Sequence, residues 1–141
     1  MRGYEMYYYN ETVVFMLYTG QYGQYVLREI TTDTSLDDLN WHFIMGTYDG
    51  VNYPSSPTGL KIYIDGTERS TVINSNTLNN QDIRGTDPFE IGSNNAGGRW
   101  SWDDSIDEVS VWSSALTSAQ ITHLYNEGLI GGHPRFQPGR I

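Results

Sequence analysis

Apolar and polar residues alternate with a period of two over most of this chain, and this alternation limits the folds open to it. In the clearest stretch, Leu60, Ile62 and Ile64 alternate with Lys61 and Tyr63. Successive side chains of a strand point to opposite faces, so this spacing indicates a strand with one buried face. Further stretches share the pattern or a β-rich composition: Tyr4–Tyr9, Val13–Tyr18, Tyr25–Ile30, Trp41–Met45, Phe89–Gly92 and Ser105–Trp112. We therefore expect an all-β protein.

Turn and loop signals separate the expected strands. Asp65-Gly66 directly follows the 60–64 stretch, and both residue types accept the positive φ angles of a tight hairpin turn. Thr67–Ile73 is then the expected return strand. Three longer stretches rich in Gly, Pro, Asn, Asp or Ser are expected to be loops: Asn52–Gly59, Asn74–Asp87 and Gly92–Asp104. Seven or eight short strands separated in this way favour a two-sheet β-sandwich.

One segment near the C-terminus changes to a helical period. Its apolar residues recur at helical spacing: Leu116, Ile121, Leu124 and Tyr125. Thr117 is the expected N-cap, and Gln120 three residues later completes a capping box, in which the two side chains satisfy free backbone donors. Gly128 is the expected C-cap. The sequence therefore predicts a short helix over Thr117–Glu127.

The composition excludes several classes of protein. The chain of 141 residues has 8 basic and 17 acidic residues, a formal net charge of −9, which disfavours a nucleic-acid reader with a basic face. It has no Cys, so disulfides, thiol chemistry and Cys-bound zinc are excluded. The longest apolar run, Val13–Tyr18, is too short to cross a bilayer. Many aromatic residues among neutral polar ones suit the recognition of neutral polar ligands.

Four motifs follow one another in a characteristic order. They are Trp41-His42-x-Ile44-x-Gly46-Thr47-Tyr48-Asp49-Gly50, Leu60-Lys61-Ile62-Tyr63-Ile64-Asp65-Gly66, Phe89-Glu90-Ile91-Gly92-Ser93, and Ile106-Asp107-Glu108-Val109-x-Val111-Trp112-Ser113-x-Ala115-Leu116-Thr117 with Ile121 and Leu124-Tyr125. Together they resemble the laminin-G-like jelly rolls of the concanavalin A-like lectin/glucanase superfamily, the group that also holds the pentraxins. The resemblance covers about Gly3–Gly128. It implies a two-sheet antiparallel sandwich over residues 1–130, followed by a Gly/Pro-rich tail at 131–141.

The resemblance also implies an open sheet edge. Domains of this kind usually begin with several strands before the part that matches Gly3 onward, and we expect those strands to be absent here. Three explanations are open: a fragment, a shortened variant, or a protomer that completes its sheets with a neighbour. A long uncharged edge invites pairing with another strand, and this edge gains little protection from Tyr7, Tyr8, Tyr9, Val13, Val14, Phe15 and Met16. We therefore expect a homo-oligomer, for which two-fold symmetry is the commonest form. The competing expectation is that Leu129, Ile130 and Phe136 fill the gap within one chain.

The loop Gly92–Asp104 is the best candidate for ligand binding. Trp100 and Trp102 flank Ser101, so in an extended segment both rings lie on one face. Sugars stack their C–H faces on such rings while nearby amides and carboxylates bond the hydroxyl groups. The expected ligand-binding residues are Asn94, Asn95, Arg99, Trp100, Trp102 and Asp103. The alternative is that one or both Trp side chains cap the core beneath the loop.

Calcium is the expected metal, in a structural role. Asp103, Asp104 and Asp107 lie close in sequence, and Ca²⁺ takes carboxylate, amide and carbonyl oxygens. The double-calcium lectin site of pentraxins is not expected, because the matching position reads Ser93-Asn94-Asn95 without carboxylates. Asp107 alternates with Val109 and Val111, so its carboxylate is expected to face inward, bonded to backbone amides or to a cation. A solvated acidic loop is the alternative to a metal site.

The sequence does not favour an enzyme. Glucanases of this superfamily carry carboxylates at alternating strand positions, which here read Asp103, Ser105 and Asp107. The outer two would stand about 13 Å apart in a strand, whereas glycosidases hold their carboxylate pair roughly 5–9.5 Å apart. Three scattered histidines, His42, His123 and His133, have no metal or triad spacing.

The leading expectation is therefore a non-catalytic carbohydrate-binding, lectin-like module. The alternative is a structural or adhesive subunit that acts through protein contacts. For either role, we expect an extracellular, cell-surface or virion-associated setting. We expect a glycan or polysaccharide as partner and no insertion into a membrane.

Overall fold

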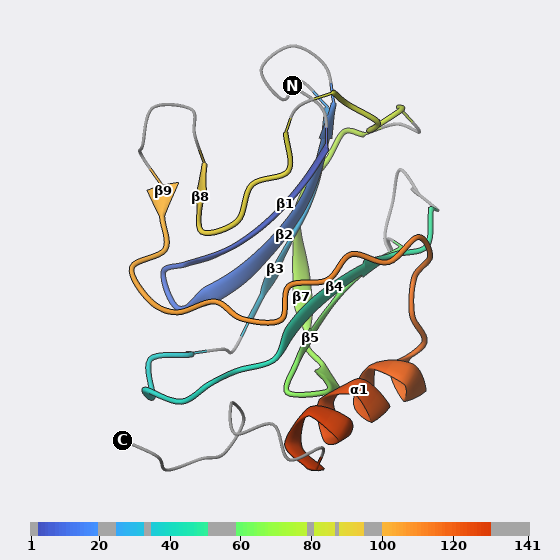
Figure 1. Ribbon diagram of the computed structural model, residues 1–141. Coiled ribbons are helices and arrows are strands. Elements are labelled where there is room, and N and C mark those ends of the chain that lie inside the picture. Colours follow the sequence, from blue (N-terminus) through green and yellow to red (C-terminus); the bar gives the residue numbers. More distant parts are fainter. Residues whose placement is uncertain are drawn as a thin grey trace.

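Two antiparallel sheets packed face to face form the body of the computed structural model, which describes residues 3–19, 25–32, 35–50, 59–78, 81–86, 88–94 and 100–130 (Figure 1). The first sheet has the strand order β1-β2-β3-β7, made of β1 (Gly3–Tyr9), β2 (Thr12–Thr19), β3 (Tyr25–Thr31) and β7 (Thr71–Asn76). The second has the order β4-β5-β6, made of β4 (Ile44–Tyr48), β5 (Leu60–Ile64) and β6 (Thr67–Glu68). The expected sandwich is confirmed.

The core lies between β2 and β5. It is a cluster of buried residues, none more than 8% exposed: Val13, Phe15, Leu17, Leu60, Ile62, Ile64 and Leu78. Alternate positions of each strand point into the cluster, as the period of two predicted. Gly46 of β4 allows the ring of Phe15 on β2 to pack closely, because a Cβ built at Gly46 would lie 2.5 Å from Cδ1 of Phe15.

Both tight turns contain residues with positive φ. Asp65 (φ 52°) and Gly66 (φ 74°) form the turn between β5 and β6, which confirms the expected hairpin. Asn10 (φ 48°) and Glu11 (φ 60°) make a similar turn between β1 and β2. Strand β4 begins at Ile44, three residues after the start of the expected Trp41–Met45 stretch.

The expected single return strand Thr67–Ile73 is wrong. Of this stretch, only the two residues of β6 pair with β5, and β7 crosses to the other sheet to pair with β3. Backbone hydrogen bonds fix the crossing: Arg69 N donates to Ile62 O at 2.9 Å, and Thr32 N donates to Ser70 O at 3.1 Å. The loop expected from Asn74 onward therefore begins only after β7, at residue 77.

Two further expected strands do not form. Phe89–Gly92 is followed instead by a two-residue ladder of β8 (Ser93–Asn94) and β9 (Trp100–Ser101) inside the expected loop. Ser105–Trp112 lies outside any ladder, and its side chains are exposed. Glu108 interrupts the segment with a φ of 52°, a left-handed conformation that breaks the extended geometry a strand needs.

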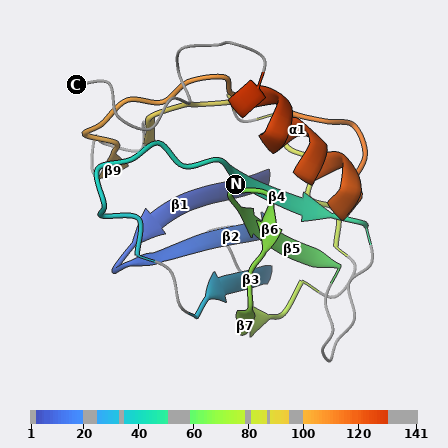
Figure 2. The same ribbon diagram turned by 90° about the horizontal axis from the view of Figure 1, so that it is seen from below.

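Helix α1 (Ser118–Ile130) docks against the β5–β6 hairpin (Figure 2). Thr122 Oγ1 donates to Gly66 O at 3.1 Å, and the Tyr63 and Ser118 hydroxyls lie 3.0 Å apart. Ile121 is fully buried. No helix in the described part of the chain is long and apolar enough to cross a membrane.

The structure confirms the predicted start of α1 but not its end. Gln120 N donates to Thr117 Oγ1, and Thr117 N donates to Gln120 Oε1, which is the capping box. Gly128 was expected to end the helix, but the helix runs on to Ile130. The Gly/Pro-rich tail at 131–141 and residues 52–58 of the expected Asn52–Gly59 loop lie outside the described residues.

Candidate functional site

The β8–β9 hairpin holds the backbone of the expected ligand-binding loop. Asn94 pairs with Trp100 and Ser93 pairs with Ser101 in its antiparallel ladder. Trp102 N donates to Gly92 O at 2.7 Å, which extends the hairpin by one bond. Asn95 and Arg99 lie outside the described residues, as do the side chains of Asn94 and Trp100. The structure therefore brings Asn94 opposite Trp100, with Trp102 two residues further along.

Of the two Trp side chains expected at this site, the structure describes that of Trp102. It is 41% exposed, so this Trp does not cap the core, and a large ring faces solvent beside the hairpin. Asp103 follows it, is exposed, and accepts a hydrogen bond from Ser101 Oγ at 3.4 Å. An exposed indole next to a carboxylate and hydroxyls can stack on an apolar face and bond polar groups at its rim.

The three aspartates expected to bind calcium each have a local partner or solvent contact. Asp104 Oδ1 accepts from Ser105 N at 2.7 Å, and Asp107 Oδ1 accepts from Glu108 N at 2.8 Å. Asp107 is exposed, so the expectation that its carboxylate faces inward is wrong, because the strand that would orient it does not form. No group of three metal-ligating side chains gathers among the residues that the structure describes. Calcium at Asp103, Asp104 and Asp107 stays a prediction.

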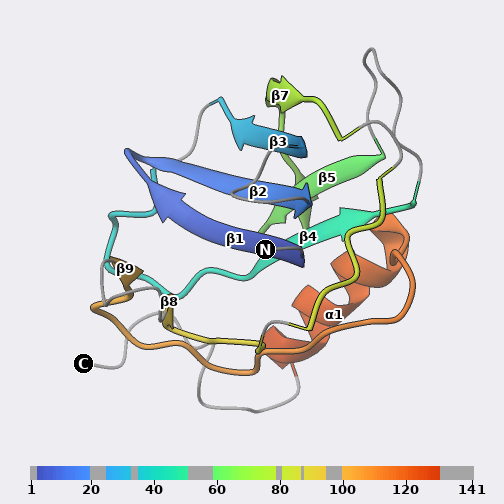
Figure 3. The ribbon, with the colours of Figure 1, turned by 90° about the horizontal axis from the view of Figure 1, so that it is seen from above.

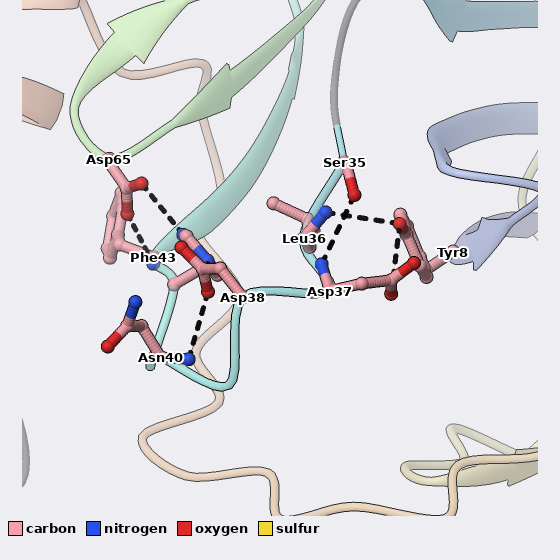
Figure 4. A network of polar contacts seen from close by, with 9 residues as sticks. Tyr8, Ser35, Leu36, Asp37, Asp38, Asn40, Phe43 and Asp65 are labelled. Carbon is pink, nitrogen blue, oxygen red and sulfur yellow. Dashed lines mark hydrogen bonds and ion pairs between the residues drawn. The ribbon is translucent and has the colours of Figure 1, made fainter.

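A polar network that the sequence analysis missed is centred on His42. His42 Nδ1 lies 2.9 Å from Asp65 Oδ2, and its Nε2 lies 2.9 Å from Asp38 Oδ1. Asp65 Oδ1 also accepts from Phe43 N at 3.0 Å, and Asp38 Oδ1 accepts from Asn40 N at 2.9 Å (Figure 4). The network therefore joins the segment before β4 to the β5–β6 turn.

Hydrogen bonds within this network shift the pKa values of His42 and Asp38. Partial burial lowers the pKa of His42, but hydrogen bonds to Asp65 and Asp38 outweigh burial, so the pKa of His42 is raised above 6.5. Hydrogen bonds from Asn40 and then from His42 lower the pKa of Asp38 to about 2. Protonated His42 can donate from both ring nitrogens, one to each carboxylate. The arrangement suits a structural role, in which His42 links Asp38 to the β5–β6 turn at Asp65.

Tyr8 ties the same segment to the first sheet. Its hydroxyl accepts from Leu36 N at 3.1 Å and donates to Asp37 Oδ1 at 3.3 Å (Figure 4). Asp38 and His42 are four residues apart, but Asp65 is 23 residues from His42 and Tyr8 is far earlier in the chain. Only the fold brings these groups together, which is why sequence spacing did not identify them.

A surface hollow beside α1 was also missed. It has a volume of about 180 Å³ and is lined by Trp112, Leu116, Gln120, His123 and Leu124. His123 is 71% exposed, so it lies at the solvent side of the hollow. The amide oxygen of Gln120 is engaged by Thr117. The surface of the hollow is therefore mostly apolar, and the indole of Trp112 forms part of it.

Comparison with known proteins places the chain in a family. The model of a laminin-G-like family, described as the concanavalin A-like lectin/glucanases superfamily, matches residues 2–122. The match spans both sheets and reaches into the first turn of α1. Neither the curated proteins nor the solved structures provide a match. With its two antiparallel sheets and its matched residues, this chain belongs to the concanavalin A-like lectin/glucanase superfamily.

Proposed function

We propose that this protein is a non-catalytic carbohydrate-binding module, which acts in an extracellular, cell-surface or virion-associated setting. Trp102 is the observation that carries the proposal: its indole is 41% exposed at the β8–β9 hairpin, next to Asp103. Membership of a superfamily that contains lectins supports it. A sandwich holds such a loop rigidly at one edge, which is where binding residues concentrate.

The chemistry of this site suits a neutral sugar. The indole of Trp102 supplies a flat apolar surface for the C–H face of a pyranose ring. Ser93 and Ser101 stand opposite each other in the ladder, and Asp103 follows on the same segment. Hydroxyl and carboxylate groups of this kind can bond sugar hydroxyls at the edge of the stacked ring. Calcium held by Asp103, Asp104 and Asp107 would stiffen the segment and lower its negative charge.

Hydrolysis is not part of this proposal. Asp103 and Asp107 are both exposed and lie on an irregular segment, not on a strand that would hold them at a fixed separation. Glycosidases need two carboxyl groups fixed on either side of the scissile bond. We therefore expect binding without release of reducing sugar, and an activity that Asp107→Asn abolishes would contradict this expectation.

A glycan array, run with calcium and with chelator, tests the binding proposal. We expect binding to at least one neutral glycan and at least a tenfold weaker affinity for Trp102→Ala. Trp112→Ala is the matched control, because that ring is 50% exposed but lies beside α1. Equal losses for both variants, or no glycan bound in either condition, would reject Trp102 as the binding residue.

A second candidate function is a structural or adhesive subunit that assembles into a homo-oligomer. The open outer edge of β1 favours it, because β1 pairs with β2 alone in the described sheet and exposes Tyr4, Met6 and Tyr9. Two copies paired antiparallel about Met6 would place Glu5 opposite Tyr7, so like charges do not meet.

The oligomer has its own test. Light scattering at micromolar concentration should give the mass of two chains, and Met6→Lys should reduce it to one. Val72→Lys on β7, the opposite edge of the same sheet, is the control, because Val72 is also exposed. A mass of one chain at every concentration would reject assembly through β1.

A further inference from the structure

A row of exposed apolar side chains crosses the surface between the β8–β9 hairpin and α1. We name it the open strip: Phe89, Ile91, Ile106, Val109, Val111 and Trp112. Its members are between 43% and 61% exposed. A β-carbon built on Gly92 would lie 3.8 Å from Cδ1 of Ile106, which places the two segments side by side. The ring centroids of Phe89 and Tyr4 are 6.4 Å apart, so the strip continues to the edge strand β1.

The backbone of this strip is open as well. In the described part of the chain, no hydrogen bond joins the backbone of Val109, Ser110, Val111 or Trp112 to another segment. Figures 1 and 3 show residues 102–115 running along the outside of the molecule to α1. Unpaired N–H and C=O groups beside alternating Val residues form the edge to which an added strand can bond.

Charge limits what can occupy this edge. Residues 88–94 and 100–112 contain no Lys or Arg, and their acidic residues are Glu90, Asp103, Asp104, Asp107 and Glu108. A second copy of the chain carries net charge −9, and its own edge strand β1 holds Glu5 and no basic residue. Like-charged strands pair poorly. The complementary occupant is a strand with basic residues.

We propose that the open strip is a docking site for an extended polypeptide strand of another protein, with apolar residues at alternate positions and Lys or Arg between them. The incoming strand bonds the backbone of Val109–Trp112, and its apolar side chains cover Val109 and Val111. Its basic side chains lie near Asp107 and Glu108. One further apolar side chain enters the 180 Å³ hollow against Trp112. This inference is independent of sugar binding at Trp102.

The backbone, the Val side chains and the carboxylates of the open strip each contribute differently to binding the strand. Backbone bonds supply affinity for any extended strand, while the alternation of Val109 and Val111 selects the spacing of its apolar residues. The carboxylates select its charge and speed its approach at low salt. Glu108, with a φ of 52°, ends the regular edge, so strand pairing begins at Val109.

Titration calorimetry of the whole chain with synthetic peptides tests the proposal. The probe is a ten-residue peptide of alternating Val and Lys with blocked ends. The first control peptide has the same composition with its five Val in one block, and the second replaces Lys by Glu. We expect the alternating Val/Lys peptide to bind at least tenfold more tightly than either control. Equal binding of the two Val/Lys peptides would show that charge alone attracts them and would overturn the proposal.

Variants of the protein locate the site. Val111→Asp should weaken binding of the alternating peptide at least tenfold, while Trp102→Ala should leave it unchanged. Val111 is 61% exposed, so this substitution leaves the core intact. Hydrogen exchange supplies a second readout, since the amides of residues 109–112 should become protected when the peptide binds. Unchanged exchange there, or a self-associated chain whose dimer Val111→Asp dissolves, would overturn the proposal.

Discussion

Replacing His42 by Gln should destabilise the protein in a way that depends on pH. The imidazole is 16% exposed and lies 2.9 Å from both Asp65 and Asp38. His42→Gln keeps a polar side chain of similar reach but removes the positive charge. The substitution therefore isolates the charge-assisted part of both hydrogen bonds.

The magnitude follows from the burial of the two partners. Asp65 is 30% exposed and also accepts from Phe43 N, so its bond to protonated His42 is the more protected one. A hydrogen bond to a charged group contributes about 1.5–3 kcal/mol. We assign no stability to Asp38, which faces water. The lower end of this range, about 1.5 kcal/mol, is the expected loss in the free energy of unfolding at pH 5.5.

The sign of the pH dependence follows from the raised pKa of His42. The folded state holds the proton more tightly than the unfolded state, in which the pKa is about 6.5. The contribution is therefore complete below pH 6.5 and is lost as the pH rises through the higher folded value. Asp38, with a pKa of about 2, stays ionised throughout this window.

Urea unfolding at pH 5.5 and at pH 8.5 measures the effect. The difference between wild type and His42→Gln should be largest at pH 5.5 and should shrink at pH 8.5. His123→Gln is the control, because His123 is 71% exposed and lies 3.9 Å from Glu127. A His42→Gln loss of the same size at both pH values would refute the role assigned to the protonated imidazole.

Four further outcomes are expected. Gly46→Ala should cost about 1–3 kcal/mol in urea unfolding, because its Cβ would overlap the ring of Phe15; an unchanged midpoint would contradict the close packing of the sheets. Thr117→Ala should cost about 1 kcal/mol through the lost cap, and Ile121→Ala about 2–5 kcal/mol; equal, negligible losses would show that α1 is not docked. Glu29→Gln should stabilise the protein at pH 7 and not at pH 4. Burial raises the pKa of the Glu29 carboxyl, so the folded state favours its protonated form and loses stability as the pH rises and the carboxyl ionises. Thermal melting of both proteins at both pH values measures the difference. Calcium at a hundredfold excess over its Kd should add about 2.7 kcal/mol, and a midpoint that chelator does not lower would remove the metal proposal.

The sequence predicted those elements that depend mainly on residues close together in the chain. The turn at Asp65-Gly66 forms because both residues accept positive φ at little cost. The Thr117–Gln120 cap forms within four consecutive residues. The period of two in the sequence predicted β1 and β5, and β-rich composition predicted β2 and β3. The two-sheet sandwich was predicted from the four motifs that resemble the family.

Tertiary contacts determined the structure of the segments whose sequence pattern fits more than one arrangement. The alternation of Thr67–Ile73 fits either sheet, and hydrogen bonds from distant segments split it between β6 and β7. Ser105–Trp112 has strand spacing, but a strand exists only where a partner satisfies its backbone, and no described segment pairs with it. His42 and Asp65 meet only once two strands have packed. Pairing, register and clusters of distant residues depend on contacts between segments far apart in the chain, which local periodicity does not encode.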